Sequence, residues 1–432
     1  MILHTLFSDH MVLQAEKPIR IFGSGAGHAS VSFLGKTYEV DCRGGDWVIE
    51  VPAKQAGGPY EMQVNIDGAE RTITDVMIGE VIIAGGQSNM QLPVGACVPP
   101  TEFEIQDEPL VRYYNTQRPE PGEWLRPEWT VATKDKARGM SAVAYFAAIR
   151  LARAKGVAVG IVTAFQGAAI LQSFIRPDLY AASECSKKFT PQYASYMLSF
   201  PVWSRPGMLY EFQIKRLSPL SVRAVVWYQG EANGHPEEAV MFTELMRMMM
   251  TSLREAFCDP FLPFVQVQLA PNQDRGIGTV KARQAQWRAS QELTGLAIVT
   301  IGDVGEPHEI HPTRKEQVGQ RVYRALMHTV YGHTEIPYLG PVKKTCTYEG
   351  GRVTVTFTHT EGGLKTDGDI NCLYLIDEAG EKHLAKCRIE GDTLVGEADI
   401  AKAVGAEFGM EPFFEMHLFN GEGIPAVSFE DR

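Results

Sequence analysis

Three short polar segments contain residue types that together could hydrolyse an ester. The first is residues 85–90, GGQSNM, which directly follow the predicted strand 80–84. Glycines permit a sharp turn from a strand into a helix, which lifts the serine hydroxyl above a sheet and turns its backbone N–H toward an oxyanion. The same pattern also fits an ordinary strand–helix turn with an N-capping serine. Ser88 is therefore the candidate nucleophile, with a purely structural turn as the alternative.

The second segment is residues 227–233, WYQGEAN, where an apolar strand ends in a cluster of polar side chains. The amide of Gln229 could donate a hydrogen bond to a developing oxyanion. Glu231 and Asn233 could hold that amide in place or contact the substrate. A β-turn with solvated polar residues is the alternative interpretation.

The third segment is residues 303–312, DVGEPHEIHP, between a predicted strand and a long predicted helix. Proline suits the first position of a helix, so Pro312 would place His311 beside the helix start at the carboxyl edge of the sheet. A histidine there could serve as the general base for a serine on another loop. It could equally be a capping or packing residue.

The same segment permits a metal-dependent alternative. His308 and His311 are three residues apart, and Asp303, Glu306 and Glu309 lie close by in the sequence. Such groups could ligate zinc and make a metallohydrolase. The spacing is not the H-E-x-x-H pattern of a helical zinc site, so we expect no metal.

The middle of the chain alternates between predicted strands and predicted helices. The strands are 80–84, 157–164, 222–228, 264–269 and 296–301, and the helices are 141–155, 238–257, 280–293 and 312–330. This alternation predicts an α/β fold with a parallel sheet covered by helices. Because the carboxyl ends of parallel strands share one edge, a serine, a donor cluster and a histidine that follow different strands can converge.

Shorter alternating runs flank this region on both sides. The sequence predicts three domains: an N-terminal β-sandwich over residues 1–75, a catalytic α/β domain over 76–335 and a C-terminal β region over 336–432. At 432 residues, the chain exceeds what one hydrophobic core usually holds.

Charge and cysteine usage exclude several classes of protein. The net charge is −11, with no cluster of lysine and arginine, so a nucleic-acid partner is not expected. Seven scattered cysteines predict neither a disulfide framework nor a zinc site. Neither a signal peptide nor a membrane-spanning stretch is visible, and we expect a cytoplasmic protein. Whether it forms a homo-oligomer stays open.

The three segments resemble the sialate O-acetylesterase family of the SGNH hydrolase superfamily. Residues 86–90, GQSNM, match the nucleophile motif of that family, 227–231, WYQGE, its donor motif, and 310–312, IHP, its histidine motif. Residues 6–14, LFSDHMVLQ, are similar to the opening motif of the family. The resemblance covers nearly the whole chain, and together these motifs are specific to the family.

The resemblance implies a serine esterase that removes O-acetyl groups from acetylated sugars, either sialic acids or xylan-type oligosaccharides, without a cofactor. Ser88 would attack the acetyl carbonyl, and His311 would relay the proton. The N–H groups of Ser88 and Gly167 and the amide of Gln229 would hold the oxyanion.

Two departures from the family pattern affect these assignments. Residues 165–168, FQGA, stand where the family usually has Trp-Gly-Gly-Thr, which suggests an altered substrate pocket around Gly167. Superfamily members often carry an aspartate three residues before the histidine, where this chain has His308. Glu309 is the nearest acid that could orient His311, with Asp303 or a backbone carbonyl as alternatives. A carbohydrate-binding protein without catalysis is the non-enzymatic alternative.

Overall fold

The predicted strand at 80–84 is the last part of a much longer strand, β8 (Ala69–Gly86). The structure, a computed structural model, describes residues 1–102, 104–116, 127–187 and 201–432. The backbone forms a first unit, Met1–Gln229 with Glu244–Phe264, and a second unit, Gly230–Thr243 with Val265–Arg432. Candidate residues Ser88, Gly167 and Gln229 therefore belong to the first unit, and Glu231, Asn233, Glu309 and His311 to the second.

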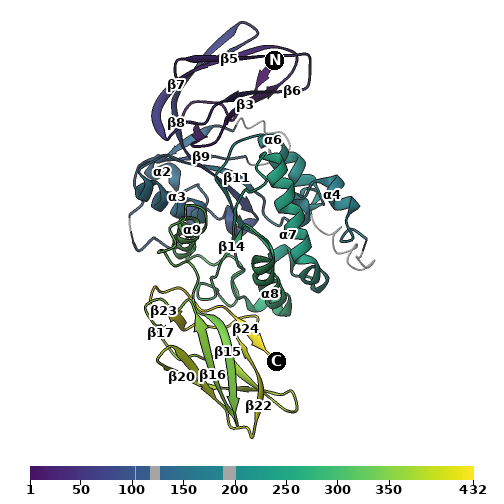
Figure 1. Cartoon of the computed structure of the whole chain (residues 1–432), viewed down its shortest axis with the longest axis vertical. Coiled ribbons are helices and arrows are strands. Elements are labelled where there is room, and N and C mark those ends of the chain that lie inside the picture. Colours follow the sequence, from purple (N-terminus) through teal and green to yellow (C-terminus); the bar gives the residue numbers. More distant parts are fainter. Residues whose placement is uncertain (103, 117–126, 188–200) are drawn as a thin grey trace. The chain divides into compact units, whose positions relative to one another are not determined.

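The N-terminal strands lie in two sheets, in which the pairings are antiparallel except that β2 runs parallel to β8 (Figure 1). One sheet has the order β1 (Ile2–Leu3), β3 (Ile19–Ser24) and β6 (Asp46–Val51). In the other, β5 (Lys36–Cys42), β4 (Gly27–Phe33) and β7 (Gly57–Ile66) lead to the first half of β8, which also pairs with β2 (Val12–Gln14). Alternate residues of β6 are buried, as expected of a sheet with one face on a core.

The second half of β8 lies between β11 and β12 in the sheet that carries the candidate residues. Within the first unit the strand order is β10 (Trp129–Ala132), β9 (Glu108–Tyr114), β11 (Val159–Phe165), β8 and β12 (Ala224–Tyr228). Strands β9, β11, β8 and β12 are parallel; β11, β8 and β12 include the predicted strands, whereas β9 was not predicted. The edge strand β10 is antiparallel to β9, so the sheet is mixed rather than purely parallel.

Helix α3 (Ala142–Lys155) packs against β9 and β11 of this sheet. It begins where the sequence predicts, because the Ser141 hydroxyl accepts the Ala144 N–H at 3.3 Å, and it ends at Gly156, with φ of 66°. Among the described residues, further helices of the first unit are α1 (Ser88–Gln91), α2 (Lys134–Ala137), α4 (Pro177–Ala182) and α6 (Lys215–Leu217). Helix α7 (Pro236–Ala256) has residues in both units.

The second unit contains the last α/β elements and the C-terminal sheets. Strands β13 (Phe264–Val267, whose first residue belongs to the first unit) and β14 (Leu296–Val299) precede and follow α8 (Gly276–Glu292), and α9 (Lys315–Thr329) packs on β14. Two four-stranded sheets follow. The first has the order β15 (Val342–Glu349), β16 (Arg352–Thr358), β21 (Thr393–Glu397) and β20 (Lys386–Glu390). The second has the order β19 (Lys382–Leu384), β18 (Leu373–Asp377), β22 (Ala403–Phe408) and β24 (Phe429–Asp431), and β17 (Leu364–Thr366) pairs separately with β23 (Leu418–Asn420). The C-terminal part of the chain thus consists of β-strands, as predicted.

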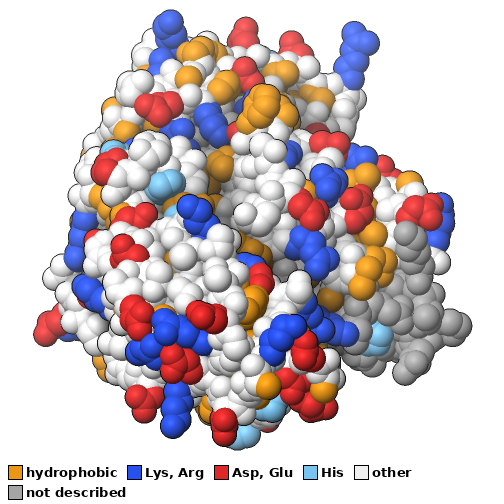
Figure 2. Space-filling model, turned by 60° about the horizontal axis from the view of Figure 1, so that its bottom comes forward, with side chains coloured by type: hydrophobic (Ala, Val, Ile, Leu, Met, Phe, Trp, Pro, Cys, Tyr) orange, Lys and Arg blue, Asp and Glu red, His pale blue; other side chains and the backbone are white. Residues whose placement is uncertain are grey.

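None of the helices in the described ranges combines the length and the apolar character that a bilayer crossing requires. On the face that Figure 2 shows, lysine and arginine side chains are interspersed with aspartate and glutamate rather than gathered into one broad basic patch.

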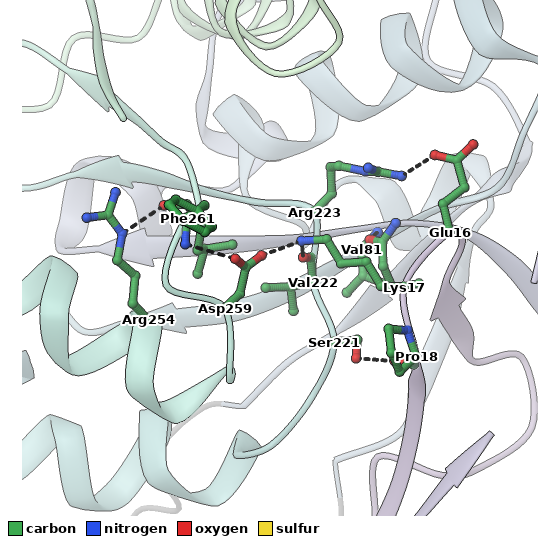
Figure 3. A network of polar contacts seen from close by, with 12 residues as sticks. Glu16, Lys17, Pro18, Val81, Ser221, Val222, Arg223, Arg254, Asp259 and Phe261 are labelled. Carbon is green, nitrogen blue, oxygen red and sulfur yellow. Dashed lines mark hydrogen bonds and ion pairs between the residues drawn. The ribbon is translucent and has the colours of Figure 1, made fainter. Parts of the chain in front are cut away.

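A network of polar contacts fixes the start of β12 within the first unit (Figure 3). The Lys17 ammonium donates to the Val222 carbonyl at 2.7 Å and pairs with Asp259 at 2.6 Å. Arg223 pairs with Glu16 at 2.9 Å, and its Nε donates to Glu80 at 2.7 Å. Since β12 leads to Gln229, this network helps to hold the register of a strand that carries a candidate site residue.

Replacing Glu80 by glutamine is expected to lower the free energy of unfolding by about 3 kcal/mol. The Glu80 side chain is only 4% exposed and faces both Arg223 and Lys155, so its loss leaves two cations without their shared anion. Urea denaturation measures the change. Glu39→Gln, which removes a carboxylate that is 72% exposed, is the control and should unfold like the parent protein. Equal stability of the two variants would contradict the role assigned to Glu80.

Candidate active site

The turn that carries Ser88 depends on two glycines at the end of β8. Gly86 has φ of 135°, and a Cβ atom on it would lie 2.1 Å from the Tyr228 carbonyl oxygen. A Cβ on Gly85 would lie 2.7 Å from the Trp227 ring. Any side chain would therefore push β12 away from β8, and the chain can turn directly from the strand into α1 only with glycine at both positions.

Ser88 is the first residue of α1, which confirms the predicted strand–turn–helix geometry. Its neighbours Gln87, Asn89 and Met90 are buried, whereas Ser88 is half-buried. The turn thus leaves the serine as its one residue with appreciable solvent contact, as a nucleophile that must meet a substrate requires.

The strand register places the other first-unit candidates next to this turn. Phe165 of β11 and Tyr228 of β12 are both paired with Gly86, on opposite sides of β8. Gly167 and Gln229 follow these strand ends by two residues and one residue. A Cβ atom on Gly167 would lie 3.8 Å from the Ser88 Cβ, so Ser88 and Gly167 are direct neighbours.

Hydrogen bonds fix the loop after β11. The Gln229 amide, fully buried, donates to the Ala169 carbonyl at 3.0 Å. The Ser204 hydroxyl donates to the Ala168 carbonyl at 2.7 Å, and Ala168 has the left-handed φ of 59°. Gln229 therefore both follows β12 and holds the backbone beside Gly167.

The Gly167 N–H donates to the side-chain oxygen of Gln91 at 2.9 Å. For this N–H to stabilise an oxyanion, it must exchange the Gln91 oxygen for the oxygen of the substrate. Gln91 was not predicted as a site residue. The available signal is its position three residues after Ser88 in a helix, which puts both on one face of α1.

Replacing Gln91 by glutamate is expected to lower kcat by roughly tenfold or more, with little change in KM. A carboxylate holds the Gly167 N–H more tightly than an amide oxygen does and repels the developing oxyanion. Gln91→Ala, which removes the competing acceptor, is the comparison and should turn over faster than Gln91→Glu. Steady-state kinetics on an acetyl ester measures kcat and KM of both variants. A wild-type kcat for Gln91→Glu would contradict the assignment of the Gly167 N–H as an oxyanion donor.

In the second unit, Glu231 and Asn233 form a short helical turn, η5 (Glu231–Asn233), and are both buried. The Asn233 amide donates to the Glu238 carboxylate at 2.6 Å. Gly230 has φ of 154°, and a Cβ on it would lie 2.9 Å from the Gln286 amide nitrogen. The bond to Glu238 gives Asn233 a role in shaping the turn after β12.

His311 lies beside Glu309. A Glu309 oxygen is 3.4 Å from Nδ1 of His311 and accepts the His311 backbone N–H at 2.7 Å. Both carboxylate oxygens of Asp303 are instead bound to Arg321, at 2.6 and 2.7 Å. Of the two predicted acids, Glu309 is therefore the one whose carboxylate lies against the imidazole.

The prediction that a helix begins at Pro312 is wrong, because α9 begins at Lys315. The Thr313 N–H and hydroxyl both donate to Glu306, at 3.1 and 3.3 Å, and this local bonding keeps residues 312–314 out of the helix. His311 consequently lies in a loop four residues before α9, with its side chain 36% exposed.

The two histidines of the metal alternative contact different carboxylates. His308 is 2.9 Å from Asp274 and is largely exposed, whereas His311 faces Glu309. In the described ranges, no three histidine, cysteine, aspartate or glutamate side chains are grouped as a metal ion would need. The residues of this segment thus do not form the zinc site that their spacing in the sequence could have allowed.

The chain is similar to known carbohydrate esterases. Residues 79–328 match the model of a family described as carbohydrate esterase, sialic acid-specific acetylesterase. The sialate O-acetylesterases of Pongo abelii and Homo sapiens are 23% and 22% identical over 388 residues, covering 78% of this chain and 72% of each relative. The crystal structure of a carbohydrate acetylesterase from Xanthomonas citri covers all of this chain and 99% of its own, with 29% identity and a TM-score of 0.86.

Proposed function

Because the chain belongs to the sialic acid-specific acetylesterase family of carbohydrate esterases, whose model matches more than half of it, we propose that it deacetylates sugars through Ser88 and His311. It is an esterase, and the predicted resemblance to sialate O-acetylesterases is confirmed. The proposal concerns the mechanism and the substrate.

In the proposed reaction, Ser88 Oγ attacks the acetyl carbonyl carbon while His311 accepts the serine proton. The oxyanion is stabilised by the N–H groups of Ser88 and Gly167 and by the Gln229 amide. The tetrahedral intermediate collapses as its C–O bond to the sugar breaks, and the departing sugar oxygen takes the proton from His311. Water, deprotonated by His311, then attacks the acetyl-serine, acetate is released, and Ser88 Oγ takes the proton back from His311. Glu309 holds the imidazole and stabilises its charged form.

The observation that carries this proposal is the register of β8 with its two neighbours. Gly86, Phe165 and Tyr228 lie level with one another, so the segments containing Ser88, Gly167 and Gln229 start from the same edge of the sheet. Glycines that admit no side chain maintain this approach. The serine and two oxyanion donors of the proposed reaction thus come from adjacent strand ends.

The proposed substrates are O-acetylated sugars, either sialic acids or xylan-type oligosaccharides. Acetate release from a panel of O-acetylated sialic acids, acetylated xylo-oligosaccharides and acetylated hexoses tests this directly. Activity on at least one sugar ester should persist after dialysis against a strong chelator, since serine–histidine chemistry needs no Lewis acid. Loss of activity that zinc restores would favour a metallohydrolase, and no release from any sugar ester would contradict the proposal.

Replacing Gln229 by alanine is expected to lower kcat by on the order of a hundredfold while KM changes little, because an oxyanion donor acts mainly in the transition state. The substitution also removes the hydrogen bond from the Gln229 amide to the Ala169 carbonyl, which holds the loop after β11. Thermal unfolding must therefore accompany the kinetics, to show that the variant is folded. An increase confined to KM would make Gln229 a substrate-binding residue instead.

A further inference from the structure

A second pocket, lined by none of the candidate catalytic residues, lies in the second unit between one face of α8 and the C-terminal strands. Its volume is about 400 Å³, within the range of small-molecule sites. Residues of α8 line one side at helical spacing: Val280, Arg283, Gln284, Trp287, Arg288 and Gln291. Val342, Lys343, Ser428, Phe429 and Glu430 are among those on the other side.

The lining combines an aromatic surface with planar polar groups. Trp287 is half-buried, so part of its indole is accessible, and Val280 and Phe429 provide further buried apolar surface. The amides of Gln284 and Gln291 lie on the same helix face. An aromatic plane beside amides and guanidinium groups matches a sugar, which has an apolar C–H face and a rim of hydroxyl groups.

Arg283 gives this pocket a buried positive charge. It is 3% exposed, and its guanidinium donates to the carbonyls of Gly409, Glu411 and Pro412 at 3.3, 2.6 and 3.2 Å. It forms no ion pair within the described part of the chain. Burial lowers the pKa of Arg283 to about 9, so the side chain stays protonated at neutral pH.

Arg288 adds a second cation without a carboxylate partner. It is exposed at the pocket and pairs with no acid among the described residues. The remaining charges of the lining are already matched: Lys343 pairs with Asp431, and Glu430 pairs with Arg432 at 2.7 Å. Two unmatched positive charges therefore remain, on a chain whose net charge is −11.

From this lining we infer that the pocket is a second, non-catalytic site that binds a carboxylate-bearing sugar unit, with the ring against Trp287 and the carboxylate toward Arg288. The choice of a sugar rests on the proposed function, whereas the need for an anion rests on Arg283 and Arg288. An exposed guanidinium can bind a carboxylate through two parallel hydrogen bonds, and the buried Arg283 strengthens the local field.

Calorimetric titration with D-glucuronate and D-glucose, which differ in that carboxylate, tests the inference. Glucuronate should bind the parent enzyme, and glucose should bind at least roughly tenfold more weakly because it lacks the charged hydrogen-bonding group. Arg288→Glu should weaken glucuronate binding at least roughly tenfold as well, by repulsion and loss of the donor. Trp287→Ala should also weaken it.

Lys281→Glu is the matched control, because Lys281 is an exposed cation of the same helix outside the pocket. It should bind glucuronate like the parent. Equal binding by Arg288→Glu and Lys281→Glu, or equal binding of glucuronate and inorganic phosphate, would overturn the inference. Acetate release from a small soluble acetyl ester should be unchanged in Arg288→Glu, so failure of the pocket and failure of the esterase proposal are separate results.

Discussion

Ser88→Ala is expected to lower kcat on an acetylated sugar by on the order of 10⁴-fold or more, because loss of the nucleophile removes the covalent route entirely. The alanine at position 88 leaves the two glycines, the register of β8 and the Gly167 loop unchanged. Substrate should therefore still bind, and any residual rate would come from the oxyanion donors alone.

Ser32→Ala is the control for this substitution. Ser32 lies on β4 and shares a hydrogen bond of 2.7 Å with Thr37 on the surface of the N-terminal sheet. It should retain full activity, which would show that removing a hydroxyl elsewhere in the chain has no effect. Wild-type turnover by folded Ser88→Ala would contradict the assignment of the nucleophile.

Replacing His311 by alanine is expected to lower kcat by roughly 10³-fold or more, since both the attack and the departure of the sugar then lack a proton carrier. Glu309→Gln should cost far less. An amide can still accept the His311 backbone N–H, and the orienting residue of such a triad is usually the least costly to lose. Steady-state kinetics on the two variants measures this order of effects.

Asp303→Asn separates the two candidate acids. Asp303 neutralises Arg321, whose side chain is only 6% exposed, so this variant should lose stability by thermal unfolding more than it loses catalysis. If folded Asp303→Asn had a lower kcat than Glu309→Gln, Glu309 would not be the orienting residue.

The sequence predicts the elements around the site well where local signals are strong. Helix α3 begins next to the Ser141 cap and ends at a glycine, and the strand candidates coincide closely with β11 and β12. The predicted strand 80–84 reveals only the buried end of β8, because residues 69–75 are mostly exposed and pair largely with β7 in the antiparallel sheet. The boundary predicted at residue 75 thus falls within one continuous strand.

Other features depend on particular side-chain contacts, between residues near or far in the sequence, which a residue pattern does not reveal. The bonds from Thr313 to Glu306 delay the start of α9, and a rule based on Pro312 alone cannot anticipate them. The same holds for Gln91, whose role comes from Gly167, 76 residues later in the chain. The predicted cytoplasmic location and the assignment of Ser88 and His311 as catalytic residues stay predictions.

The most direct test of the proposed mechanism is covalent labelling by a serine-reactive phosphonate, followed by peptide mass spectrometry. The mechanism predicts one label per chain, on the peptide containing Ser88, with activity lost in proportion to labelling. The label should be absent from Ser88→Ala and should form much more slowly in His311→Ala. Stoichiometric labelling of another residue, or full activity in the completely labelled enzyme, would contradict the central claim.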